Sequence, residues 1–224
     1  SREGGVYLSD KAETKTLLNM YKGKNDLKHA LTFTVQAKVS FCVNADKLVT
    51  VNADKFNVRV IKPIAVNGET SVSMTLNNQS TLTKTVDLSA NLVDFNGYSQ
   101  AQFFTNSGKA VKFVDYYGIT GITVDEANIT TNYSNGSENT EVWKEVDPAD
   151  FTIKLTPKSP LAYESATSGV VKDWGTVELK QINQNRPASF KVLIPVKISY
   201  KWGTCKTNVI VTVNKAGTGL AKKH

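Results

Sequence analysis

Residues 190–213 read FKVLIPVKISYKWGTCKTNVIVTV, and this stretch decides the fold class. Apolar residues occupy every second position from Phe190 to Tyr200, and mostly polar or charged residues fill the positions between them. Such alternation is typical of a β-strand with one buried face. A turn around Gly203 precedes a second alternating run, which ends at Val213. We therefore predict an antiparallel hairpin that closes a sheet.

The same pattern occurs nearer the N-terminus. Apolar residues alternate with polar ones from Phe33 to Val43, and a return strand ends at Lys62-Pro63. Proline lacks the N–H that a sheet ladder needs, so it marks an exit from the sheet. Superposing the two segments equates Phe33 with Phe190, Val58 with Val211 and Lys62 with Lys215. We interpret the two segments as a repeated closing hairpin in two successive units.

Turn signals divide the rest of the chain. A helix is predicted over residues 9–21, and Asn67-Gly68 is a strong turn directly after the first hairpin. Short alternating runs then follow, predicted as strands at 72–76, 86–95, 110–114, 119–124, 142–146, 151–155 and 177–182. We predict three segments: a partial sandwich with its closing hairpin (1–66), a main β-sandwich (67–215) and a flexible tail (216–224).

The charge pattern disfavours nucleic acid as a partner. The 224 residues carry a formal charge of +7, but no basic run is longer than two residues. Lys191, Lys197 and Lys201 are spread along one predicted strand and its turn, as expected for a solvated sheet face that resists edge pairing. No apolar stretch approaches the length of a transmembrane helix.

Residues for catalysis or metal binding are scarce, so we predict a non-enzymatic protein without cofactors. The histidines are His29 and His224, and no GxSxG motif or Cys/His cluster accompanies them. Acidic residues, among them Glu126 and Glu145, form no recognisable pair with separated environments. Cys42 and Cys205 lie far apart in sequence and are either two free thiols, which we favour, or one disulfide.

Aromatic residues are concentrated between positions 95 and 117. Their rings could stack on sugars or anchor a protein partner, while the simpler interpretation is that most of them fill the core. Tyr98, Tyr116 and Tyr117 are the candidate ligand-binding residues, because each combines an apolar ring with a polar hydroxyl.

The closing hairpin, the exit at Val60-Ile61-Lys62-Pro63 and the Asn-Gly turns together resemble the tandem immunoglobulin-like modules of bacterial surface proteins and virion-decorating proteins. The resemblance implies an all-β fold made of antiparallel immunoglobulin-like β-sandwiches, one incomplete and one complete. It also implies a structural or adhesive role outside the cell, on a cell surface or in a virion, through protein partners or self-assembly. A carbohydrate-binding module that uses exposed aromatic residues is the alternative.

Overall fold

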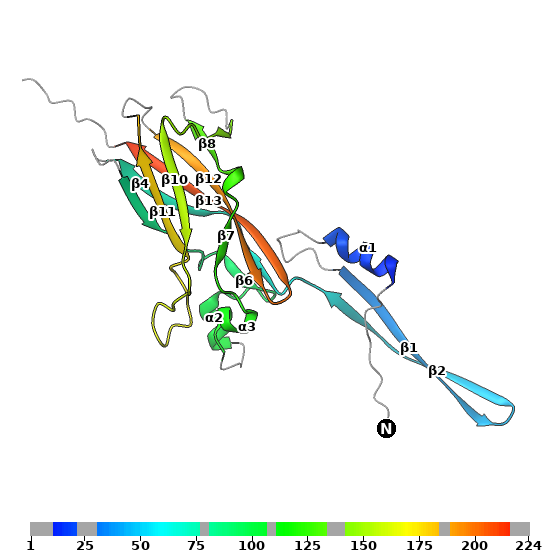
Figure 1. Ribbon diagram of the computed structural model, residues 1–224. Coiled ribbons are helices and arrows are strands. Elements are labelled where there is room, and N and C mark those ends of the chain that lie inside the picture. Colours follow the sequence, from blue (N-terminus) through cyan, green and yellow to red (C-terminus); the bar gives the residue numbers. More distant parts are fainter. Residues whose placement is uncertain are drawn as a thin grey trace, which may run out of the picture. The chain divides into compact units, whose positions relative to one another are not determined.

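The computed structural model describes residues 11–21, 31–76, 81–106, 111–133, 142–183 and 189–215 (Figure 1). The chain divides into two compact units, unit 1 (Ser1–Pro63) and unit 2 (Ile64–His224). The sequence places this boundary after Val66, and the units meet three residues earlier (66 − 63 = 3), directly after the proline that ends the first hairpin. The predicted tail, 216–224, lies outside the described residues.

Unit 1 contains one helix and one long hairpin among its described residues. Helix α1 (Ala12–Tyr21) corresponds to the helix predicted over 9–21. Strands β1 (Leu31–Asn44) and β2 (Lys47–Val60) form an antiparallel two-stranded sheet. At its tip, the side chain of Asn44 accepts a hydrogen bond from the Asp46 N–H (3.3 Å), which is an Asx turn. The expected partial sandwich needs a second sheet, and the described residues of unit 1 supply a single one.

Unit 2 contains most of the strands, as the sequence predicts for an all-β fold. Their bounds are β3 (Ile64–Val66), β4 (Thr70–Leu76), β5 (Thr81–Thr85), β6 (Leu92–Asp94), β7 (Ile122–Val124), β8 (Thr130–Tyr133), β9 (Lys144–Glu145), β10 (Phe151–Pro157), β11 (Gly175–Gln181), β12 (Ser189–Tyr200) and β13 (Gly203–Lys215). The helices are α2 (Gln100–Asn106), α3 (Phe113–Tyr117) and the 3₁₀ turn η1 (Glu126–Asn128).

The strands of unit 2 form two main sheets and a small one. One main sheet has the order β10-β11-β5, and the other has the order β4-β13-β12-β8-β9 with β7 also paired to β12. The small sheet pairs β3 with β6. Strand β4 runs parallel to β13, so the second main sheet is mixed rather than antiparallel throughout. A parallel neighbour is possible here because β4 and β13 are separated by most of the unit's chain length.

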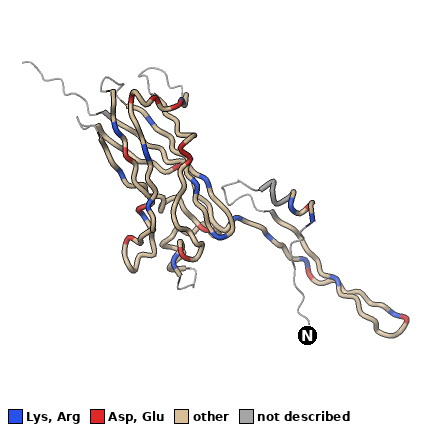
Figure 2. Tube along the Cα trace, viewed as in Figure 1, with Lys and Arg blue, Asp and Glu red and all other residues tan. Residues whose placement is uncertain are grey.

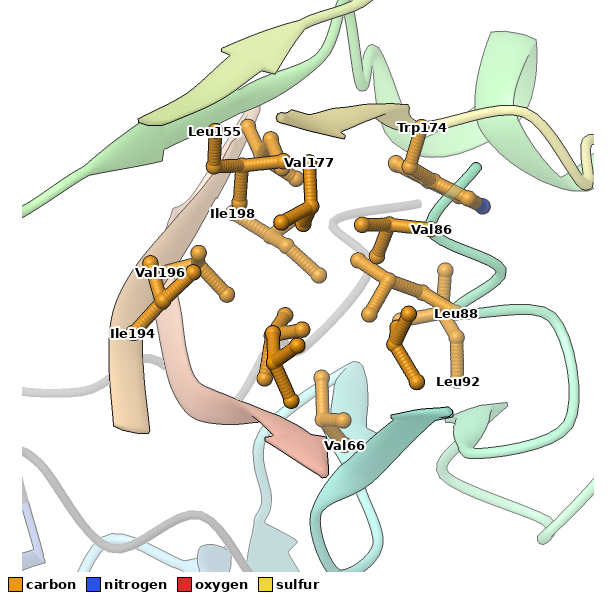
Figure 3. Packing of buried hydrophobic residues seen from close by; sticks show 14 of the residues in the cluster. Val66, Val86, Leu88, Leu92, Leu155, Trp174, Val177, Ile194, Val196 and Ile198 are labelled. Carbon is orange, nitrogen blue, oxygen red and sulfur yellow. The ribbon is translucent and has the colours of Figure 1, made fainter. Parts of the chain in front are cut away.

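The core of unit 2 lies between the two main sheets. Alternate residues of β12 and β13, among them Val192, Val196 and Val211, are almost fully buried. They belong to one cluster with Leu155 of β10 and Val177 of β11, on the opposite sheet. Figure 3 shows Ile198 of β12 beside Leu155 and Val177, with Trp174 at the border of the cluster. The alternation read from the sequence therefore gives the correct inward face for this hairpin.

The sequence predicts a strand at 110–114, and the described residues of this run form no strand. Helix α3 occupies part of that run, and α2 precedes it. Alternating apolar residues favour a strand, but Phe113 and Tyr117 are four positions apart and both are buried on one helix face. Tertiary packing thus decides the conformation of a segment whose local propensity is weak.

Candidate interaction surfaces

The β1–β2 hairpin has one apolar face. Residues directly opposite each other in an antiparallel pair point to the same side of the sheet. On this side the register joins apolar residues: Phe33 with Val58, Val35 with Phe56, Val39 with Val51 and Phe41 with Val49. We call these residues the β1–β2 apolar face.

A β-bulge keeps this face continuous. Gln36 pairs with Lys55 and Lys38 pairs with Asn52, so two residues of β2, Ala53 and Asp54, lie opposite the single residue Ala37. Val51 and Phe56 are five positions apart, so in a regular strand with a period of two they would point to opposite sides of the sheet; the bulge takes up one residue and returns both to the same side. The Gln36 side chain bonds to the Ala53 carbonyl (3.1 Å) and holds the bulge.

The distal half of the apolar face is open to solvent. Val39 is 59% exposed, Phe41 48%, Val51 52% and Phe56 44%. Residues nearer the base, such as Phe33, are half-buried. A two-stranded hairpin is at best marginally stable in water, because its apolar face has no layer to pack against. Covering this apolar face would therefore stabilise the hairpin.

The opposite face of the hairpin is polar and its side chains pair across the strands. Thr34 donates a hydrogen bond to Asn57 (3.0 Å), and the hydroxyls of Ser40 and Thr50 bond to each other (2.8 Å). The charged residues on this side are Lys38, Lys55 and Arg59. Figure 2 shows Lys and Arg spread along the strands of each unit. The polar face is thus suited to water.

A second candidate surface lies at the tip of the β12–β13 hairpin. The Lys201 N–H donates to the Tyr117 carbonyl (2.9 Å), which fixes the tip to the end of α3. The Trp202 ring then stands 6.2 Å from the Tyr117 ring and 6.4 Å from the Tyr116 ring, both edge to face. Trp202 is 62% exposed. An exposed indole beside a half-buried tyrosine is a common composition for a binding surface.

The surrounding structure fixes these rings in place. Gly118, with φ of +65°, ends α3 in the left-handed conformation that glycine adopts without strain. Phe103 of α2 packs edge to face on Phe113, with ring centroids 5.4 Å apart. The buried Gln100 side chain anchors α2 by two hydrogen bonds to the backbone of Val171 (2.9 and 3.1 Å).

The structure brings together two of the three tyrosines predicted to bind ligand. Tyr116 and Tyr117 are adjacent on α3, with ring centroids 4.9 Å apart, and Tyr98 lies outside this set of ring contacts. Tyr117 is 1% exposed, so its ring is occupied by core contacts and is not available to a ligand. Burial, together with the charges of Asp94 and Tyr116, raises the pKa of Tyr117 well above that of free tyrosine.

Tyr98 has a structural role that explains its half-buried position. It packs against the core cluster, and its N–H donates to the carboxylate of Asp94 (2.8 Å). Asp94 is itself buried and also accepts the Asn96 N–H (2.8 Å). The side chain of Asp94 thus organises the turn after β6.

The two cysteines lie in different units and do not form a disulfide with each other. Cys42 of β1 is exposed, and Cys205 of β13 is buried with its Sγ 3.4 Å from the Ile64 carbonyl oxygen. Cys42 lies opposite Leu48 on the otherwise polar side of the β1–β2 hairpin. The end of this hairpin therefore carries apolar groups on both sides.

Acidic side chains meet at one open hollow. Glu126 and Glu145 line a space of about 340 Å³ together with Phe151. Both side chains are exposed to solvent. Within the described residues no group of three His, Cys, Asp or Glu side chains is arranged to hold a metal ion. His29 and His224 lie outside the described residues.

The comparisons with known proteins supply no assignment. No protein-family model matches the chain, and no curated protein is similar to it. Of the helices that the structure describes, none has the length and apolar character needed to span a membrane.

Sequence reasoning missed two features of these surfaces. Trp202 was read only as part of a turn, although a tryptophan at a hairpin tip has few neighbours to cover it. The bulge was also missed, and its signal is the five-residue spacing between Val51 and Phe56, which breaks the period of two.

Proposed function

We propose that this chain is a non-catalytic structural or adhesive module that makes protein–protein contacts in a cell-surface or virion assembly. The observation that carries the proposal is the β1–β2 apolar face, whose outer half is about half exposed. Isolated surface valines are ordinary, but a contiguous apolar face on a paired sheet indicates an interaction site.

The strand order of unit 2 supports an immunoglobulin-like sandwich. In the lettering used for that fold, β5-β11-β10 corresponds to strands B-E-D, and β13-β12-β8-β9 corresponds to strands G-F-C-C′. Strand β4 lies beside β13, at the edge of the second sheet. The shared core between the two sheets agrees with this assignment. Such domains frequently serve in recognition and display, although the fold alone does not establish a function.

The β1–β2 hairpin also has two open strand edges. Each strand has one neighbour within the described residues, so both outer edges present backbone groups to a partner strand. Lysine is the usual protection of such edges, and Lys38 and Lys55 lie on this hairpin. Partner contact is therefore expected through the apolar face rather than through indiscriminate edge pairing.

Site-specific photo-crosslinking tests the proposed function. A benzophenone side chain replaces Val39 on the apolar face, and a matched control carries it at the neighbouring Ser40, which points to the polar face. In cells that produce the full chain, we expect a protein adduct from position 39 and a much weaker one from position 40. Equal yields from the two positions, or no adduct from either, would contradict the proposal.

Carbohydrate binding is the second candidate, and the exposed Trp202 ring favours it. Trp202 with Tyr116 offers an aromatic platform of the kind that stacks on sugar rings. A glycan array with the wild-type chain tests this idea. We expect Trp202→Ala to abolish any signal and Ile182→Ala, which also truncates an exposed apolar residue, to retain it. Absence of binding by the wild type would exclude this function for the glycans tested.

A further inference from the structure

We propose that the β1–β2 apolar face packs against the same face of a second copy of this chain. This inference rests on the proposed function and names its partner. The two hairpins would meet face to face about a two-fold axis, as two layers roughly 10 Å apart. Each copy would then cover the apolar residues of the other.

The arrangement of large and small side chains suits such a self-contact. In three of the cross-strand pairs, a phenylalanine stands opposite a valine: Phe33 with Val58, Phe56 with Val35, and Phe41 with Val49. The phenylalanines therefore alternate between strands along the hairpin, first β1, then β2, then β1. A surface with alternating bulky and small residues can interdigitate with a rotated copy of itself.

The size of the surface also fits a dimer. Val39, Phe41, Val51 and Phe56 are each about half exposed, and with their half-buried neighbours they leave on the order of 500 Å² of apolar surface open, a size at which surface patches are often functional. Two copies would then bury up to about 1,000 Å² in total, which lies at the lower limit expected of a specific interface. Residues at the rim would add to this area.

The charges of the hairpin favour contact through the apolar face and oppose the addition of further copies. Lys38, Lys55 and Arg59 lie on the polar face, so two copies stacked through their polar faces would repel each other. Packing through the apolar faces instead leaves these cations in water on the outside of the pair. Those outward cations also oppose the addition of a third layer. The expected product is a dimer and not a fibre.

Sedimentation velocity with the purified full chain tests the inference. We expect dimers at concentrations of about 50 µM in buffer of moderate salt. The double variant Phe41→Lys with Val51→Lys places charges in the contact, and it should weaken dimerisation at least about 30-fold. The matched control, Ser40→Lys with Thr50→Lys, adds the same charges to the polar face. It should change the dimerisation constant less than about 3-fold.

The outcomes separate this inference from the proposed function. A wild-type chain that stays monomeric at about 200 µM, or a control that dissociates as readily as the apolar-face variant, would overturn the second-copy inference. If the photo-crosslink from Val39 then joins a different protein, the proposed function survives. The far-UV circular dichroism spectra of both double variants should match that of the wild type, which shows that the strands of the hairpin persist and excludes its unfolding as the cause.

Discussion

The β1–β2 and β12–β13 hairpins are built on the same alternation and have opposite surroundings. In β12–β13 the inward residues, such as Val192 and Val211, are wholly buried against the facing sheet. In β1–β2 the equivalent side carries Val39 and Phe41, which are about half exposed. Alternation thus defines which face of a hairpin is apolar, whereas the facing layer must come from elsewhere. Unit 2 provides that layer itself.

The two hairpins also differ in register. The β12–β13 ladder runs without interruption from Ser189–Asn214 to Tyr200–Gly203, while β1–β2 contains two register shifts. Phe33 pairs with Val58, whereas Phe190 pairs with Val213. The superposition that equates Val58 with Val211 is therefore wrong by two residues. The coincidence of Lys62 with Lys215 depends on that superposition and is lost with it.

Truncation of core residues should produce the largest contrast between the hairpins. Ile194→Ala removes a fully buried side chain, and we expect it to lower the free energy of unfolding of unit 2 by about 3 kcal/mol. Phe41→Ala removes a larger but half-exposed side chain and should change the free energy of unfolding of unit 2 by less than about 0.5 kcal/mol. Urea denaturation of monomeric protein, followed by circular dichroism, measures both. Similar losses would show that the β1–β2 face is already covered within the chain.

Changes at the bulge should have the next largest effect. Deleting Ala53 alone leaves a regular ladder with the apolar face intact, so dimerisation should persist. Deleting both Ala53 and Asp54 brings Val51 opposite Lys38 and splits the face, and it should weaken dimerisation at least about 10-fold. Sedimentation velocity compares the two deletions, and equal behaviour would mean that the continuous face is not the contact.

Much of the fold could be predicted from the sequence because alternating apolar and polar residues show which face of a strand is apolar. This alternation identified both hairpins and the inward positions of β12. It failed at α3, where Phe113 and Tyr117 are held in a helix by contacts with residues distant in sequence. It also failed to predict exposure of the β1–β2 face, since alternation does not encode what lies opposite. The burial of Tyr117 could not be predicted either, because a lone sequence does not show which aromatic residues the core encloses.

Alkaline pH should lower the stability of unit 2. Burial, and secondarily Cys205, raises the pKa of Tyr200 to about 12. The native state therefore retains a proton that the unfolded chain releases near pH 10, and stability that is complete below pH 10 is lost as the pH rises towards about 12. The urea midpoint should fall over this range, and less steeply for Tyr200→Phe. An equal fall of the urea midpoint in the wild type and in Tyr200→Phe would contradict the burial of Tyr200.

Salt should have the smallest effect on the contact. The cations Lys38, Lys55 and Arg59 repel their counterparts across the dimer only weakly, because they are exposed and face outward. Raising the salt concentration should strengthen dimerisation by a few-fold at most, through screening. A pronounced weakening instead would indicate that ion pairs, and not apolar packing, hold the two copies together.

Thiol reactivity measured against protein concentration tests the central claim most directly. The variants are Val39→Cys and Ser40→Cys, each combined with Cys42→Ser, and the buried Cys205 serves as an internal reference. We predict that the thiol at position 39 reacts more slowly as the concentration rises, that the thiol at position 40 keeps a constant rate, and that Cys205 stays unreactive throughout. Constant and equal rates at positions 39 and 40 would show that no second copy covers the β1–β2 apolar face.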